Sequence, residues 1–194
     1  MEEFNSYISR PELTVLKDLC IRQGKLTRLR KKDFFCHQGE TTLYVAYIEE
    51  GLLRYTCLND SEGKEYSVGF TFTHEFVADY PGCLYGIPSE VSIQAATDCT
   101  LYLLPVDILK RFIEESPQGQ YIGRIMAEQL FLQIYPRLLD TYRKTIEERY
   151  KELLRRYPYI IEVLSLREIA SFLHVTPETI SHIRKKILID AQKS

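Results

Sequence analysis

The stretch VTPETISHIRKK, residues 175–186, gathers side chains that can contact nucleic acid. The carboxylate of Glu178 can accept a hydrogen bond from cytosine, and the imidazole of His182 can donate one to guanine. The hydroxyls of Thr179 and Ser181 can reach bases or phosphates. Three cations that suit backbone phosphates follow: Arg184, Lys185 and Lys186. The same stretch would also suit a solvated amphipathic helix, so the flanking elements must decide between the two.

Two short helices joined by a tight turn are predicted around this stretch. Ser165 and Glu168 have the S-x-x-E spacing of a capping box, which predicts a helix beginning near Leu166. Thr176 is a favourable N-cap, and Pro177 suits the first helical position because no amide donor is needed there. This is helix-turn-helix spacing, in which the second helix enters the major groove. The apolar residues expected to pack the two helices are Ile169, Ala170, Leu173, Ile180, Ile183 and Ile187.

The charge distribution agrees with a basic C-terminal segment. Residues 1–140 carry 14 Lys+Arg and 20 Asp+Glu, a net charge of −6, whereas residues 141–194 carry 11 and 7, a net charge of +4. An acidic body with a basic end is typical of a chain whose basic end meets a polyanion, although chance drift of charge gives the same picture.

The segment from Leu26 to Pro105 is predicted to form at least six short strands, arranged as an antiparallel barrel or jelly roll. Gly51 is expected to bend a hairpin between two alternating runs, and the polar residues 59–64 are expected to form a second turn. Two further strands are predicted around residues 97–98.

Helices are predicted on both sides of the strands. Residues 1–24 are expected to be helical, with a start signal at Ser9 before Pro11. A helix is predicted over 105–116, and a long one follows at about 118–139, where Pro136 predicts a kink or a break. Thr145 and Glu148 have capping-box spacing before another helix. The long helix carries an apolar stripe at Ile122, Ile125, Met126, Leu130, Ile134, Leu138 and Leu139.

Two stretches of the sequence resemble one family. LREIASFLHVTPETISHIRKK is similar to the helix-turn-helix of the Crp/Fnr transcription regulators. The family's recognition helix carries E-x-x-S-R, and Glu178, Ser181 and His182 stand at those positions, so a histidine replaces the arginine. FFCHQGETTLYVAYIEEGLLRYTCLNDSEGKEYSVGF resembles the first half of the family's cyclic-nucleotide-binding-type β-roll.

The resemblance implies an α+β fold with three parts: a β-roll sensor domain at 1–115, a dimerisation helix at 116–142 and a helix-turn-helix domain at 143–194. It implies a cytoplasmic bacterial regulator that is a homodimer, binds double-stranded DNA at a pseudo-palindrome and works with RNA polymerase. The DNA-binding residues it implies are Ser165, Arg167, Thr176, Pro177, Glu178, Thr179, Ser181, His182, Arg184, Lys185 and Lys186.

The effector of such a regulator is not predicted to be cyclic AMP. The family's nucleotide binders use Gly-Glu and then Arg-Ser or Arg-Thr, but Ala78-Asp79 and Ser89-Glu90 stand at the matching positions. Without the arginine, a buried phosphate facing Glu90 would lack a cation and would be disfavoured. Residues Asp79, Tyr80, Ser89 and Glu90 are therefore expected to line a pocket for another effector, or to be the vestige of one.

No cofactor or metal is predicted, because the five cysteines are scattered and form no CxxC pair. An enzyme is not expected either, since no nucleophile–base pair, carboxylate pair or phosphate loop has usable spacing. No signal peptide or apolar run of about 20 residues is present, so no membrane association is expected.

The competing interpretation is a ligand-binding or protein-interaction module whose DNA-binding head is degenerate. His182 favours it, and so does the short segment ILIDAQKS after Lys186, where the family places a β wing. A head without a full wing predicts weaker, strongly salt-dependent DNA binding.

Overall fold

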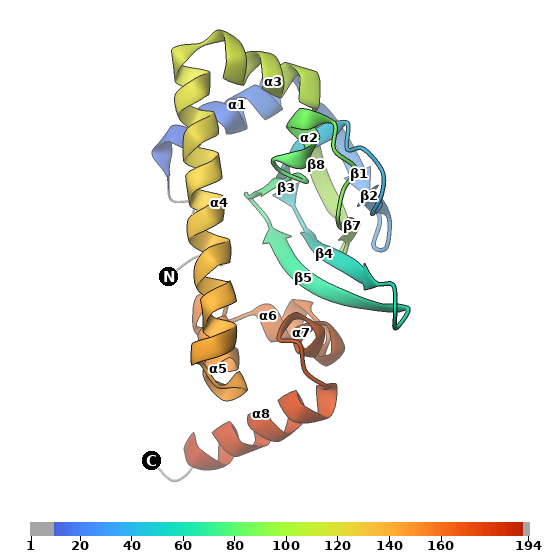
Figure 1. Cartoon of the computed structure of the whole chain (residues 1–194), viewed down its shortest axis with the longest axis vertical. Helices are drawn as coiled ribbons and strands as arrows, with labels where there is room; N and C mark the ends of the chain where they lie inside the picture. The colour runs from blue at the N-terminus through green and yellow to red at the C-terminus, as the bar shows by residue number, and fades with distance from the viewer. Residues whose placement is uncertain (1–9, 192–194) are drawn as a thin grey trace.

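The computed structural model describes residues 10–191, so the start signal at Ser9 lies outside the described residues. A β body lies beside a long helix, and a group of short helices lies below the body at the far end of that helix (Figure 1). The strands are β1 (Lys25–Leu29), β2 (Phe34–Cys36), β3 (Tyr44–Glu50), β4 (Leu52–Asn59), β5 (Lys64–Phe72), β6 (Phe76–Val77), β7 (Ser92–Ala95) and β8 (Cys99–Pro105). The helices are the 3₁₀ turn η2 (Pro11–Leu13), α1 (Thr14–Gln23), α2 (Gly82–Tyr85), α3 (Val106–Glu115), α4 (Pro117–Arg143), α5 (Ile146–Arg156), α6 (Ile160–Val163), α7 (Leu166–Phe172) and α8 (Pro177–Ala191). Within residues 10–191, no helix combines the length and the apolar character needed to cross a bilayer.

The β body consists of two antiparallel four-stranded sheets, ordered β1-β8-β3-β6 and β2-β7-β4-β5. Alternate residues of facing strands point into one core, as a two-sheet antiparallel architecture requires. Ile48 and Leu101 of one sheet and Leu53 and Ile93 of the other are fully buried there. The predicted antiparallel β-roll and the mixed α+β class are therefore confirmed.

The hairpin predicted at Gly51 is wrong, because β3 and β4 belong to different sheets and do not pair with each other. Gly51 instead carries the chain from one sheet to the other, with a positive φ of 112°. A Cβ at this position would lie 2.6 Å from both the Asp98 carbonyl oxygen and the Cys99 sulfur, so glycine is needed for the crossing. The predicted turn at 59–64 does join two paired strands, β4 and β5, with Asn59 opposite Lys64.

Helix α4 is continuous through Pro136, so the predicted break is absent. Proline in a helix interior costs about 3 kcal/mol because it removes an amide donor and crowds the preceding turn. Burial of Ile122 and Ile125 against the body offsets that cost, and Asp140 near the end of α4 forms local ion pairs with Arg143 and Lys144, three and four residues further on.

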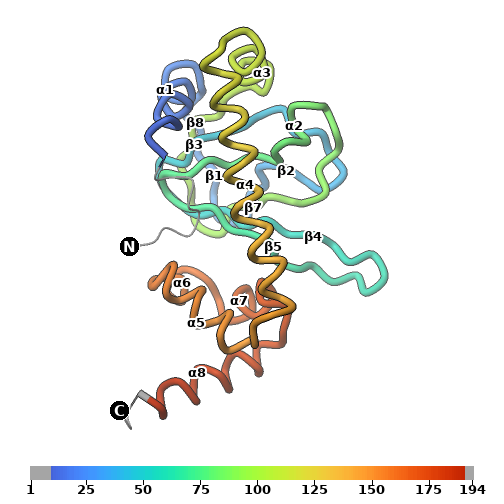
Figure 2. The backbone as a smooth tube through the Cα atoms, turned by 60° about the vertical axis from the view of Figure 1, so that its left-hand side comes forward, coloured from blue at the N-terminus to red at the C-terminus, as the bar shows by residue number. Residues whose placement is uncertain are grey.

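The apolar stripe of α4 is buried only in its first half. Below Met126 the buried positions of α4 are polar, and Gln129 and Asp140 are both only 7% exposed. The outward side is apolar instead and is exposed to solvent, and Figure 2 shows no helix or strand of residues 10–191 covering it. The large exposed side chains on this side are Phe131, Leu132, Tyr135 and Tyr142.

The C-terminal helices α5 to α8 form a small head whose core is continuous with one sheet of the body. Tyr150, Ile169 and Ile180 of the head are buried in the same cluster as Phe70 and Phe72 of β5. The head is therefore packed against the outer face of the β4–β5 sheet, as Figure 1 shows for α7.

Candidate DNA-binding site

Three helices of the C-terminal head begin at side-chain caps that the sequence predicted. The Ser165 hydroxyl accepts from the Glu168 amide at 3.2 Å, and the Glu168 carboxylate accepts from the Ser165 amide at 2.8 Å. Thr145 and Glu148 form the same reciprocal capping box at α5. At α8 the Thr176 hydroxyl accepts from the Thr179 amide at 3.3 Å, directly before Pro177. These caps confirm where the three helices start.

The turn between α7 and α8 is held by the backbone. His174 adopts the left-handed conformation, with φ of 59°. The Val175 amide donates to the Ala170 carbonyl at 2.9 Å, and the His174 amide donates to the Ser171 carbonyl at 3.0 Å. This pair of bonds is the Schellman motif, which ends a helix sharply and redirects the chain. The turn therefore sets the angle at which α8 leaves α7.

Helix α8 divides into a buried side and an exposed side. Ile180 and Ile183 are buried against the head, which leaves the polar residues between them facing solvent. In Figure 1 this helix is the lowest element and lies away from the β body. The predicted DNA-binding residues that are exposed are Ser165, Arg167, Thr176, Glu178, Ser181, His182, Arg184, Lys185 and Lys186, while Pro177 and Thr179 are half-buried.

The N-terminal end of α8 stabilises a negative charge at Glu178. A hydrogen bond from its own backbone amide, and then one from the Thr176 side chain, lower the pKa of the Glu178 carboxyl. Glu178 is therefore an ionised hydrogen-bond acceptor at neutral pH, which is the form that can accept from an amino group of a base.

Lys186 differs from the other two cations because it already has an acidic partner. Its Nζ lies 2.7 Å from a carboxylate oxygen of Glu147 on α5. Hydrogen bonds from Lys151 and from Lys186 lower the pKa of Glu147 to about 2. Arg184 and Lys185 have no such ion pair within residues 10–191 and stand exposed on α8.

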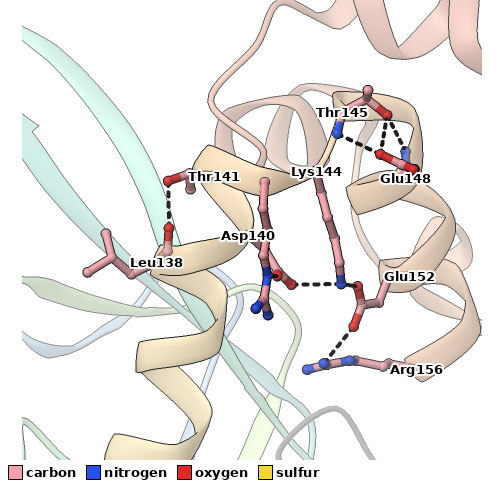
Figure 3. A network of polar contacts seen from close by, with 9 residues as sticks. Leu138, Asp140, Thr141, Lys144, Thr145, Glu148, Glu152 and Arg156 are labelled. Carbon is pink, nitrogen blue, oxygen red and sulfur yellow. Dashed lines mark hydrogen bonds and ion pairs between the residues drawn. The ribbon is translucent and has the colours of Figure 1, made fainter.

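A polar network holds the joint between α4 and α5 (Figure 3). Lys144 lies between Asp140, 2.9 Å away, and Glu152, and its hydrogen bonds to Glu152 and then Asp140 raise its pKa. Arg156 donates to the other oxygen of Glu152 at 2.7 Å. The network joins the end of the long helix to α5, so the head is attached to α4 by more than the connecting backbone.

A second set of contacts, which no sequence pattern indicated, joins α7 to β5. The Ser67 amide donates to the Ser171 hydroxyl at 2.8 Å, across a separation of 104 residues. Arg54 lies 3.8 Å from Glu168 and 3.1 Å from Glu65. The rings of Tyr66 and His174 also meet edge to face. Local sequence patterns cannot reveal pairs so far apart in the chain.

The predicted effector residues are only partly brought together. Asp79 and Tyr80 line a cavity of about 280 Å³ between β4, β5 and the middle of α4. Ser89 is buried beside this cavity, where its hydroxyl donates to the Val91 carbonyl at 2.8 Å. Glu90 is exposed and does not line the cavity. The lining is otherwise mostly apolar, and Arg137 of α4 also lines it.

The Asp79→Asn variant is expected to raise the melting temperature at pH 7. Burial, and the charge of Glu90, raise the pKa of Asp79, while a Ser89 hydrogen bond opposes them. A raised folded-state pKa means that the ionised carboxylate destabilises the fold, so stability from Asp79 is present at low pH and is lost as pH rises through that pKa. Differential scanning fluorimetry should show the higher melting temperature of the variant at pH 7. Its difference from the wild type should disappear as the pH is lowered toward 3.8, the ordinary pKa of an aspartate carboxyl. The exposed Asp60→Asn variant is the control and should leave the melting temperature unchanged. A lower melting temperature of Asp79→Asn than of the wild type at pH 7 would contradict the argument.

Comparison with known proteins supports this architecture. Residues 26–116 match the cyclic nucleotide-binding domain family. A protein described as a probable transcriptional activator, from Rhizobium leguminosarum bv. viciae, is 29% identical over 158 residues, which is 74% of this chain. The chain spans 62% of that relative's length, which is less than two thirds.

Solved structures share the fold over nearly the whole chain. FixK2 from Bradyrhizobium japonicum superposes with a TM-score of 0.74 at 20% identity, covering 87% of this chain and 86% of that one. A transcriptional regulator of the CRP/FNR family from Thermus thermophilus gives a TM-score of 0.63 at 18% identity, covering 86% of this chain and 87% of that one.

The fold is that of a β-roll joined through a long helix to a helix-turn-helix head. The chain shares this fold with solved structures described as transcriptional regulators of the CRP/FNR family.

Proposed function

We propose that this protein is a DNA-binding transcription regulator that reads its operator through α8. The observation that carries the proposal is the exposed row of hydrogen-bonding and cationic side chains on α8, presented by a capped helix-turn-helix. In this class of motif the first turns of the second helix meet base edges and the basic residues bind phosphates. Glu178, Ser181 and His182 take the base-contacting role, and Arg184 and Lys185 the phosphate role.

The remaining proposed DNA-binding residues would hold α8 in the major groove through contacts to the phosphate backbone. Ser165 and Arg167, exposed at the start of α7, would meet the phosphate backbone beside the groove. Thr176, Pro177 and Thr179 form the N-terminal turn of α8, whose positive helix-dipole end would face the phosphate backbone. Lys186 would bind DNA only by exchanging Glu147 for a phosphate.

The direct test is fluorescence anisotropy of the purified protein with labelled genomic fragments at low salt. The logarithm of the association constant is expected to fall linearly with the logarithm of the salt concentration, since phosphate contacts release counterions. An anisotropy that stays flat at low salt would contradict the proposal and favour the alternative, a ligand-binding or protein-interaction module with a degenerate head.

The functional unit is proposed to be a homodimer formed through α4. The outward side of α4 exposes Phe131, Tyr135 and Tyr142, and the first two rings stack with centroids 5.2 Å apart. Apolar residues that recur along one side of a helix of 27 residues are typical of a helix–helix seam. A two-fold axis along α4 would present two α8 helices to successive major grooves, about 34 Å apart.

The Phe131→Glu variant is expected to be monomeric where the wild type is dimeric. A carboxylate in an apolar seam would be desolvated without a partner, and its twin would face it across the two-fold axis. Light scattering after size exclusion, at the same micromolar concentration for both proteins, reports the mass. Leu26→Glu, which places the same charge on an exposed apolar residue of β1, should remain dimeric. A wild type of single-chain mass would contradict the dimer.

The β body is proposed to act as the sensor, with the cavity beside Asp79 and Tyr80 as its effector site. The Asp79 carboxylate does not suit a cyclic phosphate, because Ser89 and Glu90 supply no cation beside it and Arg137, which lines the cavity from α4, lies over the ring of Phe172. The domain limits proposed above, 1–115, 116–142 and 143–194, assign this cavity to the boundary of the first two. RNA polymerase is the proposed protein partner when the regulator is bound at a promoter.

A further inference from the structure

Glu147 in the first turn of α5 reaches a cation of α8 that lies 39 residues further along the chain. One carboxylate oxygen of Glu147 lies 2.7 Å from the Nζ of Lys151 on its own helix, and the other lies 2.7 Å from the Nζ of Lys186. The side chain of Glu147 is 23% exposed, whereas those of the two lysines are 54% and 55% exposed. One partly buried carboxylate thus occupies a cation on the helix proposed to read DNA.

This ion pair distinguishes Lys186 from its neighbour Lys185. The hydrogen bond and the charge of Glu147, and then the charge of Asp190, raise the pKa of the Lys186 ammonium. Lys185 is exposed and forms no ion pair within residues 10–191. A phosphate that approaches Lys185 meets an uncompensated charge, but a phosphate that approaches Lys186 has to displace a carboxylate that is already in place.

The second lysine lowers the cost of that displacement. When Lys186 turns to a phosphate, Lys151 still holds the other oxygen of Glu147, so the carboxylate is not left without a cation. Lys186 lies nine residues after Pro177, or about 14 Å further along the helix axis, beyond the first turns that enter the groove. It is therefore placed to meet the DNA backbone once α8 is seated.

We propose that Glu147 makes DNA binding more selective by withholding Lys186 from the phosphates of non-specific DNA. Non-specific binding consists of phosphate contacts alone, so α8 has no single position on the duplex and no phosphate stays beside Lys186. In an operator complex, base contacts from α8 select one position, and a phosphate held there can displace Glu147. This role rests on the proposed DNA-binding function and acts through Lys186.

The test compares two labelled duplexes by fluorescence anisotropy at one salt concentration. One is the genomic fragment that the wild type binds most tightly, and the other is a scrambled duplex of the same length and composition. Glu147→Gln is expected to bind the scrambled duplex about three- to tenfold more tightly than the wild type, because one phosphate contact is gained. Its affinity for the genomic fragment should change by less than about twofold, since Lys186 already binds a phosphate there.

Variants of the two lysines show through which cation Glu147 acts. In the Glu147→Gln background, Lys186→Ala should remove the tighter binding to the scrambled duplex, whereas Lys151→Ala should retain it. Glu147→Gln should also steepen the slope of log K against log salt on that duplex by roughly 0.9, which a merely structural role would not do. Glu162→Gln removes the same charge from an exposed position of α6 and should bind both duplexes like the wild type.

Lys186→Ala gives a second result that does not depend on how Glu147→Gln folds. On the scrambled duplex it should bind within about twofold of the wild type, whereas Lys185→Ala should bind about three- to tenfold more weakly. Thermal unfolding without DNA should find Glu147→Gln folded, because the capping box of Thr145 and Glu148 is retained.

Two results would overturn this role of Glu147 while leaving DNA binding intact. In the first, Glu147→Gln and the wild type bind the scrambled duplex equally. In the second, Glu147→Gln tightens binding to both duplexes by the same factor, so that the carboxylate lowers affinity without discriminating. If neither the wild type nor any variant binds either duplex at low salt, the DNA-binding function itself is contradicted, and the role of Glu147 with it.

Discussion

The Arg184→Ala/Lys185→Ala double variant is expected to bind DNA about 10–100-fold more weakly than the wild type at moderate salt, because two phosphate contacts are lost. Both side chains are exposed on α8, and neither forms an ion pair with another described residue. Their removal should leave the head folded, since Ile180 and Ile183 on the opposite side keep its core. Circular dichroism should therefore be unchanged.

The salt dependence gives a sharper measure than a single affinity. Each phosphate contact contributes roughly 0.9 to the slope of log K against log salt, so the double variant should lower that slope by about 2. Anisotropy titrations at several salt concentrations determine both slopes. Lys25→Ala/Arg28→Ala removes the same two residue types from the exposed edge strand β1, far from α8, and should retain the wild-type slope. Equal binding by the wild type and the α8 double variant would show that this helix does not carry the DNA contacts.

Gly119→Ala is expected to destabilise the fold by about 3 kcal/mol or more, at the upper end of what single substitutions do. Gly119 lies where α3 turns into α4, and its amide donates to the Ser116 hydroxyl at 2.8 Å. A Cβ there would lie 1.7 Å from the Phe112 carbonyl oxygen and 2.6 Å from its carbon. These are backbone atoms of α3, so the two helices would have to separate.

Gly123→Ala on the same helix is the matched control. Its Cβ would meet the side chain of Ile113 at 3.1 Å, and a side chain can move where a carbonyl cannot. Alanine also favours a helix by about 1 kcal/mol over glycine, so this variant should change stability by about 1 kcal/mol at most. Denaturant unfolding at one fixed protein concentration compares them, because a dimer's stability depends on concentration. Similar midpoints for the two variants would contradict the steric argument.

The sequence by itself determined the features that depend on short-range patterns. The caps at Ser165 and Thr145, and the Thr176-Pro177 start of α8, depend on side chains three residues apart, so their partners are visible in the sequence. The polar turn at 59–64 and the alternation of the strands are similarly local. Their order along the chain was enough to predict a β-roll, a long helix and a helix-turn-helix, as the structure confirms.

Only the tertiary structure decided which distant surfaces meet. Gly51 had the right type for a hairpin, but the strand pairing that excludes one depends on β8 and β7, which lie far along the chain from it. Pro136 predicted an interruption, but α4 is continuous, and the body against which Ile122 and Ile125 are buried comes from distant parts of the chain. The physical reason is the same in each case: burial and pairing are set by neighbours in space, which local periodicity does not encode.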